Sequence, residues 1–480
     1  MEKKLADLNF SNRLYKTSPA LFHSVKPTPL ENPTLLHVNL KLLNELGLSS
    51  EITKNSSFLR FINGDLEFEG PFFGSSFYAG HQFGYFVPML GDGRAIMIGE
   101  ISTEKNFYEL QLKGAGLTPF SRRGDGKAVV RSSIREYLAS AHLKSLNIPS
   151  TEALTIHRGD DDVYREEVEK SAIVLRVAES FLRFGHFQYL ATTNQKRELK
   201  KLVDFVIENY FPNFFQHQNQ YVLFFQEITK RTAKLFARWQ AVGFCHGVLN
   251  TDNMSILGLT LDYGPFGFID NLNPDFICNH SDHDGRYSLG HQPGIGLWNL
   301  EQLALSLTSL IPTTDLDRTL NTYTTIFSVE YQNLLLAKCG LYKRNDNSES
   351  FLRETLLMLE ITKLDYTNFF RALSQYETED IYWKQFPYAH SCELDNWLTL
   401  YRSQLSLENL SESIRHERML QVNPKFILRN YLAQLAIENH LLIEDLFKVL
   451  SDPFSNWPEF HHWSYPAPPE LSNLSVSCSS

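Results

Sequence analysis

The chain has 480 residues, of which 43% are hydrophobic and 13% aromatic, and its formal net charge is −10. A chain of this length can hold two or three average domains or one large two-lobed unit. Its acidic balance argues against a general binder of nucleic acid or of anionic membranes, so we expect neither as a partner. The start of the chain lacks a continuous apolar segment and no apolar run reaches membrane-spanning length, so we expect no signal peptide and no membrane helix.

The five cysteines favour a reduced, cytoplasmic protein. They stand at Cys245, Cys278, Cys339, Cys392 and Cys478, an odd number with no C-x-x-C pair. This spacing fits neither a secreted disulfide framework nor a zinc ribbon.

Residues 1–65 are expected to form an N-terminal extension, punctuated by prolines and ending in a short helix at Leu46-Gly47. Residues 66–190 mix the two kinds of secondary structure. Apolar and alternating patterns predict strands at Ala95–Gly99, Phe107–Lys113 and near Ala172–Arg176, and helical spacing covers 129–146. The acidic run from Asp160 to Glu169 is interpreted as a solvated loop.

Residues 191–456 are predicted to be mainly helical, and residues 457–480 form a proline-rich tail on the surface. The clearest amphipathic segments are Leu199–Tyr210, Phe224–Val242, Leu297–Leu310, Leu320–Cys339 and Phe426–Asn439. A mixed N-terminal lobe followed by a largely helical C-terminal lobe is typical of protein kinases. We therefore predict an α+β, protein-kinase-like fold of two lobes.

The segment from His246 to Asn253 resembles a protein-kinase catalytic loop with one part missing. Kinases place a base Asp two residues after the His and a metal-binding Asn seven after it. Asn253 has the second spacing and Asp262-Tyr263-Gly264 stands where D-F-G follows, but the base position is Val248, which cannot take a proton. The chain is thus either an inactive kinase or an enzyme for a different transfer.

Oxygen-bearing side chains in this segment suit a metal and a base. Asn253 and Asp262 carry the oxygen ligands that Mg²⁺ prefers together with phosphate oxygens. Asp252 is the carboxylate of the loop and hence the available base, although a turn or cap is its alternative role.

Lys113 at a strand end and Glu136 on the next helix match the strand–helix ion pair that holds nucleotide phosphates in kinases. The alternative is two solvated side chains that never meet. Arg176 and Arg183 follow downstream, and without further context surface or structural salt bridges are the favoured interpretation for them.

Two glycine-rich turns flank these elements. Gly91, Gly93 and Arg94 belong to the first, and Asp125 and Gly126 belong to the second, which is rich in basic residues. Backbone N–H groups of such turns can close on phosphate oxygens. Asp-Gly is also a frequent turn dipeptide, so two ordinary turns remain the alternative.

Several long motifs resemble the selenoprotein O family of protein adenylyltransferases. They are Tyr78–Gly84, Gly91–Ala95, Gln111–Gly116, Pro119–Gly126, Arg131–Glu136, His246–Gly258, Asp262–Phe268, Cys278–Asp282 and the ending Ser477–Ser480. The resemblance spans nearly the whole chain. It implies a pseudokinase fold that binds ATP in a flipped orientation, transfers AMP to a Ser, Thr or Tyr hydroxyl of a protein and releases diphosphate. Bacterial members are also linked to UMP transfer from UTP with Mn²⁺.

The resemblance also implies a role for each matching residue. It assigns nucleotide binding to Gly91, Gly93, Arg94, Lys113, Asp125, Gly126, Arg176, Arg183 and Asp262. Glu136 would be the partner of Lys113, Asp252 the proton acceptor, and Asn253 and Asp262 the ligands of Mg²⁺ or Mn²⁺. The rival hypotheses are a catalytically inactive, ATP-binding pseudokinase scaffold and a plain kinase.

The tail departs from some relatives, which carry a C-x-x-C or C-x-x-Sec pair where this chain has Ser475 and Cys478. A redox pair within that motif is therefore excluded. A disulfide between Cys278 and Cys478 is a hypothesis for redox control, and two unrelated free thiols are the favoured alternative, because cytosolic thiols are mostly reduced.

Overall fold

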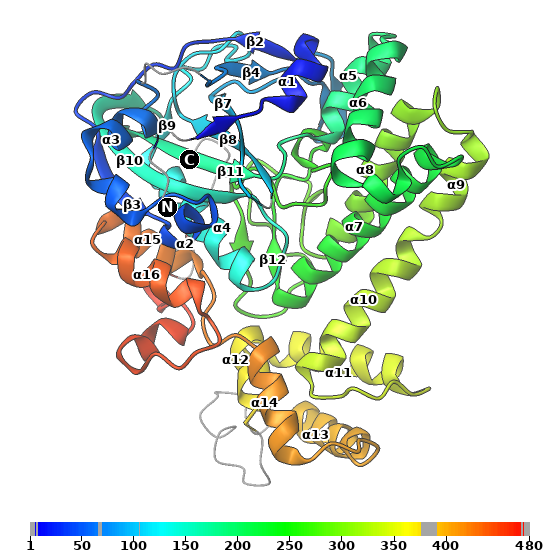
Figure 1. Cartoon of the computed structure of the whole chain (residues 1–480). Coiled ribbons are helices and arrows are strands. Elements are labelled where there is room, and N and C mark those ends of the chain that lie inside the picture. The colour runs from blue at the N-terminus through cyan, green and yellow to red at the C-terminus, as the bar shows by residue number, and fades with distance from the viewer. Residues whose placement is uncertain are drawn as a thin grey trace.

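The structure, a computed structural model, describes residues 5, 8–65, 70–104, 106–375, 391–471 and 474. It joins a sheet-rich N-terminal region to a helical C-terminal region (Figure 1), so the predicted α+β class is confirmed. Within the described residues, no helix combines the length and the apolar character that crossing a membrane requires.

An antiparallel sheet of nine strands forms the N-terminal region, in the order β2-β4-β7-β8-β11-β10-β3, with β1 paired to β7 and β9 to β11. Its strands are β1 Asn9–Phe10, β2 Phe22–Ser24, β3 Thr34–Val38, β4 Gly74–Ser76, β7 Ala95–Ser102, β8 Phe107–Lys113, β9 Ala128–Val129, β10 Glu152–Tyr164 and β11 Val168–Ala178. Residues 1–65, expected to form an extension, therefore supply three strands of this sheet. Two small two-stranded sheets lie outside it, a hairpin of β5 Gly80–Gln82 with β6 Tyr85–Val87, and a pairing of β12 Phe244–Cys245 with β13 Gly267–Phe268.

The polar face of β8 is buried rather than solvated. This face carries Glu109, Gln111 and Lys113, as the alternation in the sequence indicates. Each of the three residues is at most 6% exposed. Gln111 and Lys113 are instead hydrogen-bonded to buried charged groups of neighbouring elements. A central strand thus carries polar side chains inward, toward the site described below.

The interpretation of the acidic run as a loop is wrong. Asp160–Asp162 belong to the end of β10, and the turn that follows covers only residues 165–167. Two lysines make this possible, because Lys127 lies 3.0 Å from Asp161 and Lys170 lies 2.7 Å from Asp162. Cations on neighbouring segments offset the repulsion that would otherwise disfavour three aspartates in one strand.

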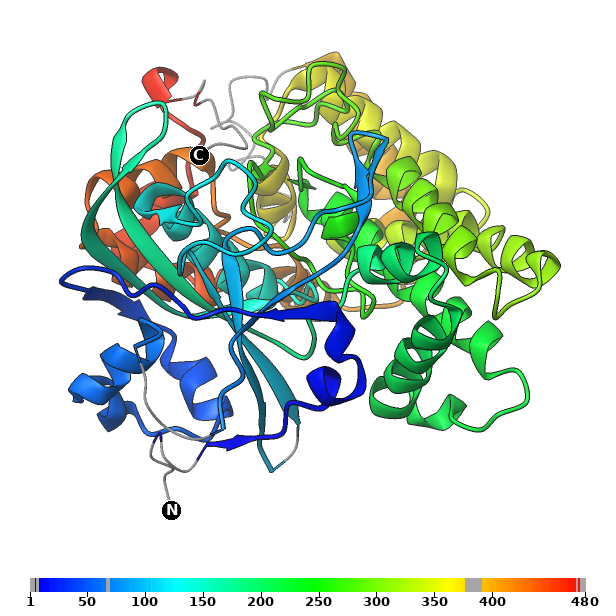
Figure 2. The ribbon, with the colours of Figure 1, turned by 90° about the horizontal axis from the view of Figure 1, so that it is seen from above.

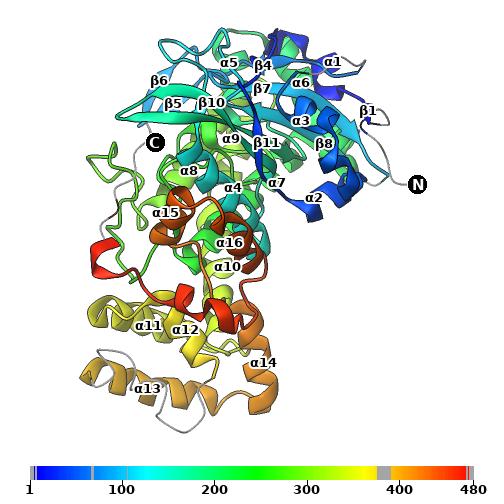
Figure 3. The same cartoon turned by 90° about the vertical axis from the view of Figure 1, so that its left-hand side faces the viewer.

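Helices cover both faces of the sheet. Apolar side chains of α2 Leu40–Glu45 and α3 Ser56–Ile62 pack on one face, and α4 Val130–Ser145 packs on the other. The C-terminal helices α15 Asn430–Glu438 and α16 Leu442–Ser451 return to pack against α4 (Figure 3). The Tyr137 ring of α4 stacks on Phe447 at 5.3 Å between centroids.

The predicted helix at Phe426–Asn439 begins four residues later than expected. Arg429 has extended backbone torsions, and its guanidinium donates hydrogen bonds to Asp365 at 2.8 and 3.0 Å. The buried ion pair therefore fixes this segment outside the helix, which starts at Asn430.

The remaining helices build the C-terminal region beside the sheet (Figure 2). They are α5 Phe184–Thr192, α6 Lys196–Tyr210, α7 Gln220–Val242, α8 Gln292–Leu307, α9 Thr313–Leu320, α10 Tyr323–Lys338, α11 Ser348–Thr362, α12 Tyr366–Leu373, α13 Cys392–Leu405 and α14 Glu412–Val422; the short α1 Arg13–Thr17 belongs to the N-terminal region. The long α7 packs against α8 and α10. Residues 458–471 of the predicted tail form two short 3₁₀ turns, and Trp463 there is buried in the main apolar core.

Gly243 ends α7 and redirects the chain into β12 and the loop that begins at His246. Its φ of +69° lies in the left-handed region, and a Cβ at this position would stand 2.5 Å from Cγ1 of Ile269. Glycine is therefore needed both for the turn and for the close contact.

We expect Gly243→Ala to lower the free energy of unfolding by about 2–4 kcal/mol, since left-handed strain and overpacking add together. Urea denaturation followed by circular dichroism measures the change. Gly294→Ala in α8 is the matched control, because an added Cβ there meets no heavy atom within 4 Å. That control should be neutral or stabilising by up to about 1 kcal/mol; equal effects at both positions would contradict the assignment.

Candidate active site

A cleft of about 390 Å³ lies where the sheet meets the loops that follow α7. Eight of the residues selected from the sequence line it: Gly91, Gly93, Arg94, Lys113, Arg176, Asp252, Asn253 and Asp262. The first three come from the turn before β7, the next two from β8 and β11, and the last three from the loops after β12. Segments far apart in the sequence thus meet at one opening.

Glu136 of α4 lies behind the cleft and binds two cations at once. Its carboxylate accepts hydrogen bonds from Nζ of Lys113 and from Nε of Arg176, and a further one from Nη2 of Arg176 at 3.0 Å. All three side chains are buried. Burial alone would raise the pKa of Glu136, but the two cations outweigh it and hold that pKa below its usual value.

Arg176 connects this pair to Asp262. Its Nη1 lies 2.9 Å from Oδ1 of Asp262, while Arg183 donates to Oδ2 of the same carboxylate. Burial disfavours the charged form of Asp262, yet Arg183, Arg176 and Lys113 together hold the pKa of Asp262 well below its usual range. Asp262 therefore stays an anion, and Lys113, Glu136, Arg176, Asp262 and Arg183 form one continuous charged network.

His246 positions the loop that carries Asp262. Its buried ring forms a hydrogen bond through Nε2 with the carbonyl of Leu261 at 2.8 Å. The next residue, Asp262, has a φ of +54°, a conformation that residues other than glycine seldom adopt. The network around its carboxylate compensates for this strain.

Asp252 is buried beside the hairpin formed by β5 and β6. Its Oδ2 accepts a hydrogen bond from Nε2 of Gln82 at 3.3 Å, and its buried Oδ1 has no hydrogen-bond partner among the described residues. Burial raises the pKa of Asp252 to about 6, although nearby Arg183 opposes the shift. A carboxylate with a pKa near neutrality and an unsatisfied oxygen is suited to accept a proton.

Asp92 is a site residue that the sequence reasoning missed. It is 5% exposed and accepts hydrogen bonds from the hydroxyl of Tyr78 at 3.1 Å and from Nε2 of Gln111 at 3.2 Å. Arg183 approaches the same carboxylate at 3.7 Å. Asp92 stands inside the quoted Gly91–Ala95 motif, but an Asp-Gly turn gives no sign that its carboxylate is buried.

Three of the residues assigned to nucleotide binding do not line the cavity. Arg183 is 2% exposed and lies beneath it, with Nη1 donating to the carbonyl of Asp252 at 2.9 Å. Asp125 is held at the surface by Arg165 at 2.8 and 2.9 Å. The backbone of Gly126 packs so closely on Gly116 that a Cβ would stand 2.1 Å from that carbonyl oxygen.

The donors at the cleft fit a divalent metal that arrives with phosphate. In the described part of the chain no group of three or more His, Cys, Asp or Glu side chains is placed to hold a metal. Asn253, Asp262 and the unsatisfied oxygen of Asp252 nevertheless offer hard oxygen donors at one opening. Mg²⁺ and Mn²⁺ accept one or two protein oxygens when phosphate and water complete the coordination.

Comparison with known proteins identifies one family over nearly the whole chain. Residues 4–461 match the family model described as protein adenylyltransferase SelO. This chain belongs to the SelO protein adenylyltransferase family. It is 41% identical to the protein nucleotidyltransferase YdiU of Photobacterium profundum, with all of both chains covered. It is 43% identical to the YdiU of Vibrio atlanticus and 42% identical to that of Myxococcus xanthus, each over at least 98% of both chains.

Membership of the SelO family confirms the predicted family resemblance and the predicted class of enzyme. The chain is a transferase of the protein nucleotidyltransferase class, and the rival of a plain protein kinase loses its support. The absence of a carboxylate at Val248 is consistent with nucleotidyl transfer in place of the phosphoryl transfer of protein kinases.

Cys278 is deeply buried in this SelO-family chain. It is 6% exposed, and its Sγ lies 3.4 Å from the carbonyl oxygen of Cys245. Burial raises the pKa of the Cys278 thiol well above its usual value, so little thiolate is present at neutral pH. Cys478 lies outside the described residues, and the disulfide between the two stays a prediction.

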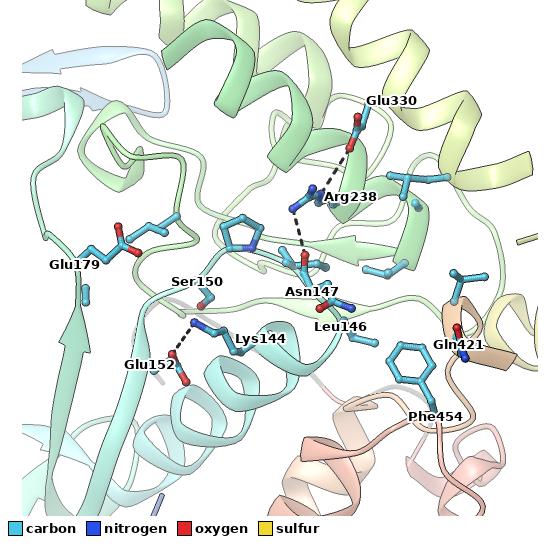
Figure 4. A pocket seen from close by; sticks show the side chains of 18 of the residues that line it. Lys144, Leu146, Asn147, Ser150, Glu152, Glu179, Arg238, Glu330, Gln421 and Phe454 are labelled. Atoms are coloured by element: carbon cyan, nitrogen blue, oxygen red, sulfur yellow. Dashed lines mark hydrogen bonds and ion pairs between the residues drawn. The ribbon is translucent and has the colours of Figure 1, made fainter. Parts of the chain in front are cut away.

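A larger cavity, of about 710 Å³, shares no lining residue with this cleft. Figure 4 shows it from close by. Several of its charged side chains are paired within the wall, Lys144 with Glu152 at 2.9 Å and Arg238 with Glu330 at 3.7 Å. It contains none of the residues that the family motifs supply. Size alone therefore does not identify the active site.

We expect Glu136→Gln to lower the free energy of unfolding by about 3–5 kcal/mol, because it leaves buried Lys113 without its anion and leaves Arg176 with Asp262 as its remaining anion. Chemical denaturation measures the loss. The matched control is Glu169→Gln, which removes the more accessible ion pair with Arg131 at 2.7 Å and should cost about 1 kcal/mol or less. Equal losses in the two variants would show that the Glu136 network does not stabilise the fold.

Proposed function

We propose that this enzyme transfers AMP from ATP to Ser, Thr or Tyr hydroxyls of proteins and releases diphosphate. One observation carries the proposal. The cations Lys113 and Arg176, the anion Asp262 and the carboxylate of Asp252 share one cleft, while the kinase base position holds Val248. The parts that bind a triphosphate and a metal are thus present beside a displaced proton acceptor.

A two-lobed, protein-kinase-like arrangement accounts for the chain order of these parts. A strand lysine pairs with a helix glutamate in the sheet-rich region, and the metal-binding type of loop follows a long helix in the other region. That order is the one protein kinases use. The fold then supplies the nucleotide site, and the chemistry depends on how the nucleotide lies in it.

Positive charge on the cleft wall suits the phosphates of ATP. Arg94 lines the cleft, and its guanidinium has no hydrogen bond or ion pair with any described residue. It is therefore available to an anionic ligand. Lys113 and Arg176 face the same opening, and in a flipped ATP they would neutralise the diphosphate that leaves.

Asp252 takes the role of proton acceptor. The hydroxyl oxygen of the protein acceptor attacks the α-phosphorus, its proton passes to Asp252, and the bond from the α-phosphorus to the bridging oxygen breaks. The new P–O bond holds AMP, and diphosphate leaves with the electron pair. Because Asp252 accepts the proton, the position that holds the base in kinases can be occupied by Val248, which cannot accept one.

Asn253 and Asp262 would hold a Mg²⁺ or Mn²⁺ ion that arrives with the nucleotide. The ion would supply charge stabilisation for the phosphate oxygens. The strong anionic character of Asp262, maintained by Arg176 and Arg183, suits this role. UTP with Mn²⁺ is a second nucleotide to test, since the curated relatives are named only as nucleotidyltransferases.

Incubation with ATP labelled at the α- or the γ-phosphate tests the proposal. We expect the α-label, and not the γ-label, to appear on protein, and chelation of divalent metal to stop the transfer. Asp262→Asn should reduce transfer about a hundredfold or more, because the charge that supports metal and phosphates is lost. Asp275→Asn, which changes an exposed carboxylate of the following loop, is the control and should behave as the wild type.

The outcome separates the hypotheses. Transfer of the γ-label would mean a kinase, and absence of both labels at every acceptor tried would mean an inactive scaffold. Full activity of a folded Asp262→Asn variant would contradict its role at the metal.

Asp252→Asn separates proton transfer from nucleotide binding. The amide preserves the shape of the side chain and cannot accept the proton, so turnover should fall about a hundredfold or more. The Kd for ATP, measured by calorimetry, should change less than about threefold. A variant that keeps its turnover, or one that loses ATP binding and turnover together, would argue against Asp252 as the proton acceptor.

A further inference from the structure

The β5–β6 hairpin is a small structure that can be followed in Figure 3. Its residues Gln82 and Phe83 line the cleft. Two residues form its turn, Phe83 with a φ of +50° and Gly84 with a φ of +86°. Positive φ at both positions is typical of the tight turn that matches the twist of two antiparallel strands. Such a turn fixes which residues face each other across the hairpin.

Hydrogen bonds tie this hairpin to the loop that carries Asp252. The backbone N–H of His81 donates to Oγ1 of Thr251 at 2.7 Å, and that of Phe83 donates to Oδ1 of Asn250 at 3.2 Å. Gln82 completes the connection through its bond to Asp252 at 3.3 Å. The hairpin is therefore held in a fixed position relative to the proposed proton acceptor.

The register of the hairpin places Tyr85 on the same face as Gln82. These two residues are direct cross-strand partners, and such partners project their side chains to one side. The neighbouring pair, His81 and Phe86, occupies the opposite face, where the centroid of the His81 ring lies 5.2 Å from that of Trp298 of α8. Tyr85 thus belongs to the face that looks toward Asp252.

Tyr85 is nevertheless almost free of intramolecular packing. It is 80% exposed, and Met89, two residues beyond β6, is 66% exposed. A tyrosine on a rigid turn provides a large contact area at a small cost in conformational entropy, a property common in binding surfaces. Neither side chain contributes to the described apolar cores.

We propose that the exposed side chains of Tyr85 and Met89 form the docking surface for the acceptor polypeptide. The occupant is an extended segment with an apolar side chain next to the hydroxyl that receives AMP. This inference rests on the proposed function, because a protein hydroxyl must reach Asp252. The rigid attachment of the hairpin to residues 250–252 places such a segment in register with the proton acceptor.

Peptide acceptors test the docking surface. The set carries a central Ser, Thr or Tyr, with Leu, Phe, Asp or Lys at the neighbouring positions, and dephosphorylated casein serves as a protein acceptor. Wild-type enzyme with α-labelled ATP should prefer peptides with Leu or Phe. Tyr85→Ala should raise the KM for those peptides about tenfold and abolish the preference, while the KM for ATP stays unchanged.

Tyr164→Ala is the matched control, because Tyr164 is also a hairpin residue and is 76% exposed. It should leave both KM values unchanged. Met89→Ala provides a second variant of the surface, and Tyr85→Phe should restore most of the peptide affinity, since the ring is retained.

The results separate the two proposals. If wild-type enzyme transfers the α-label but Tyr85→Ala matches it in peptide KM and preference, the docking surface is wrong and the proposed function stands. If the KM for ATP rises equally in Tyr85→Ala, the residue acts through the fold and the docking surface is again wrong. If wild-type enzyme labels no acceptor, the proposed function fails and the docking surface fails with it.

Discussion

Two cations, Lys113 and Arg176, share the single buried carboxylate of Glu136, and the shape of the cleft depends on that shared contact. Lys113 belongs to β8, Arg176 to β11 and Glu136 to α4, so the contact joins two central strands to the helix on one face of the sheet. Burying one anion with two cations leaves an excess of positive charge. Asp262 supplies the second anion, and through it the sheet is connected to the loops of the helical region.

The charge balance of this network explains why a nucleotide site can exist in an acidic protein. The net charge of −10 describes the whole surface and does not determine the potential inside a cleft. Arg94, Lys113 and Arg176 face the opening, and the anions that partner the last two lie behind or beside them. The protein as a whole is therefore acidic, while a phosphate group that entered the cleft would meet Arg94, Lys113 and Arg176 on its wall.

The sequence motifs selected eight of the residues that line the cleft, because motif spacing depends on local order along the chain. Asn253 and Asp262 follow His246 at nearly kinase spacing, and Lys113 ends a strand with clear alternation, so all three could be selected from the order of residues alone. The expected strands at 95–99, 107–113 and 172–176 are present within longer or equal elements for the same reason.

Features that depend on long-range burial could not be predicted. Asp92 is recognisable as part of a turn, but its burial against Tyr78 and Gln111 requires the sheet to be assembled. The acidic run at Asp160–Asp162 is strand rather than loop because Lys127 and Lys170 meet it from other segments. In each case a residue from another segment of the chain lowers the free energy of burying or clustering a charged group, and the local sequence does not identify that residue.

The loop after His246 differs from a kinase catalytic loop in what surrounds its proposed base, Asp252. Here Asp252 is covered by the hairpin of β5 and β6, whose Gln82 binds one carboxylate oxygen and whose backbone at Gly80 is so close that a Cβ would stand 2.9 Å from the other. That cover removes water, raises the pKa of Asp252 to about 6 and makes the carboxylate a stronger base than an exposed aspartate. The same hairpin presents Tyr85 to solvent on the face of Gln82. If Asp252 is the proton acceptor, as proposed, one short hairpin both sets the pKa of that carboxylate and presents a surface to the acceptor polypeptide, which would link acceptor binding to the chemistry more directly than a separate docking site.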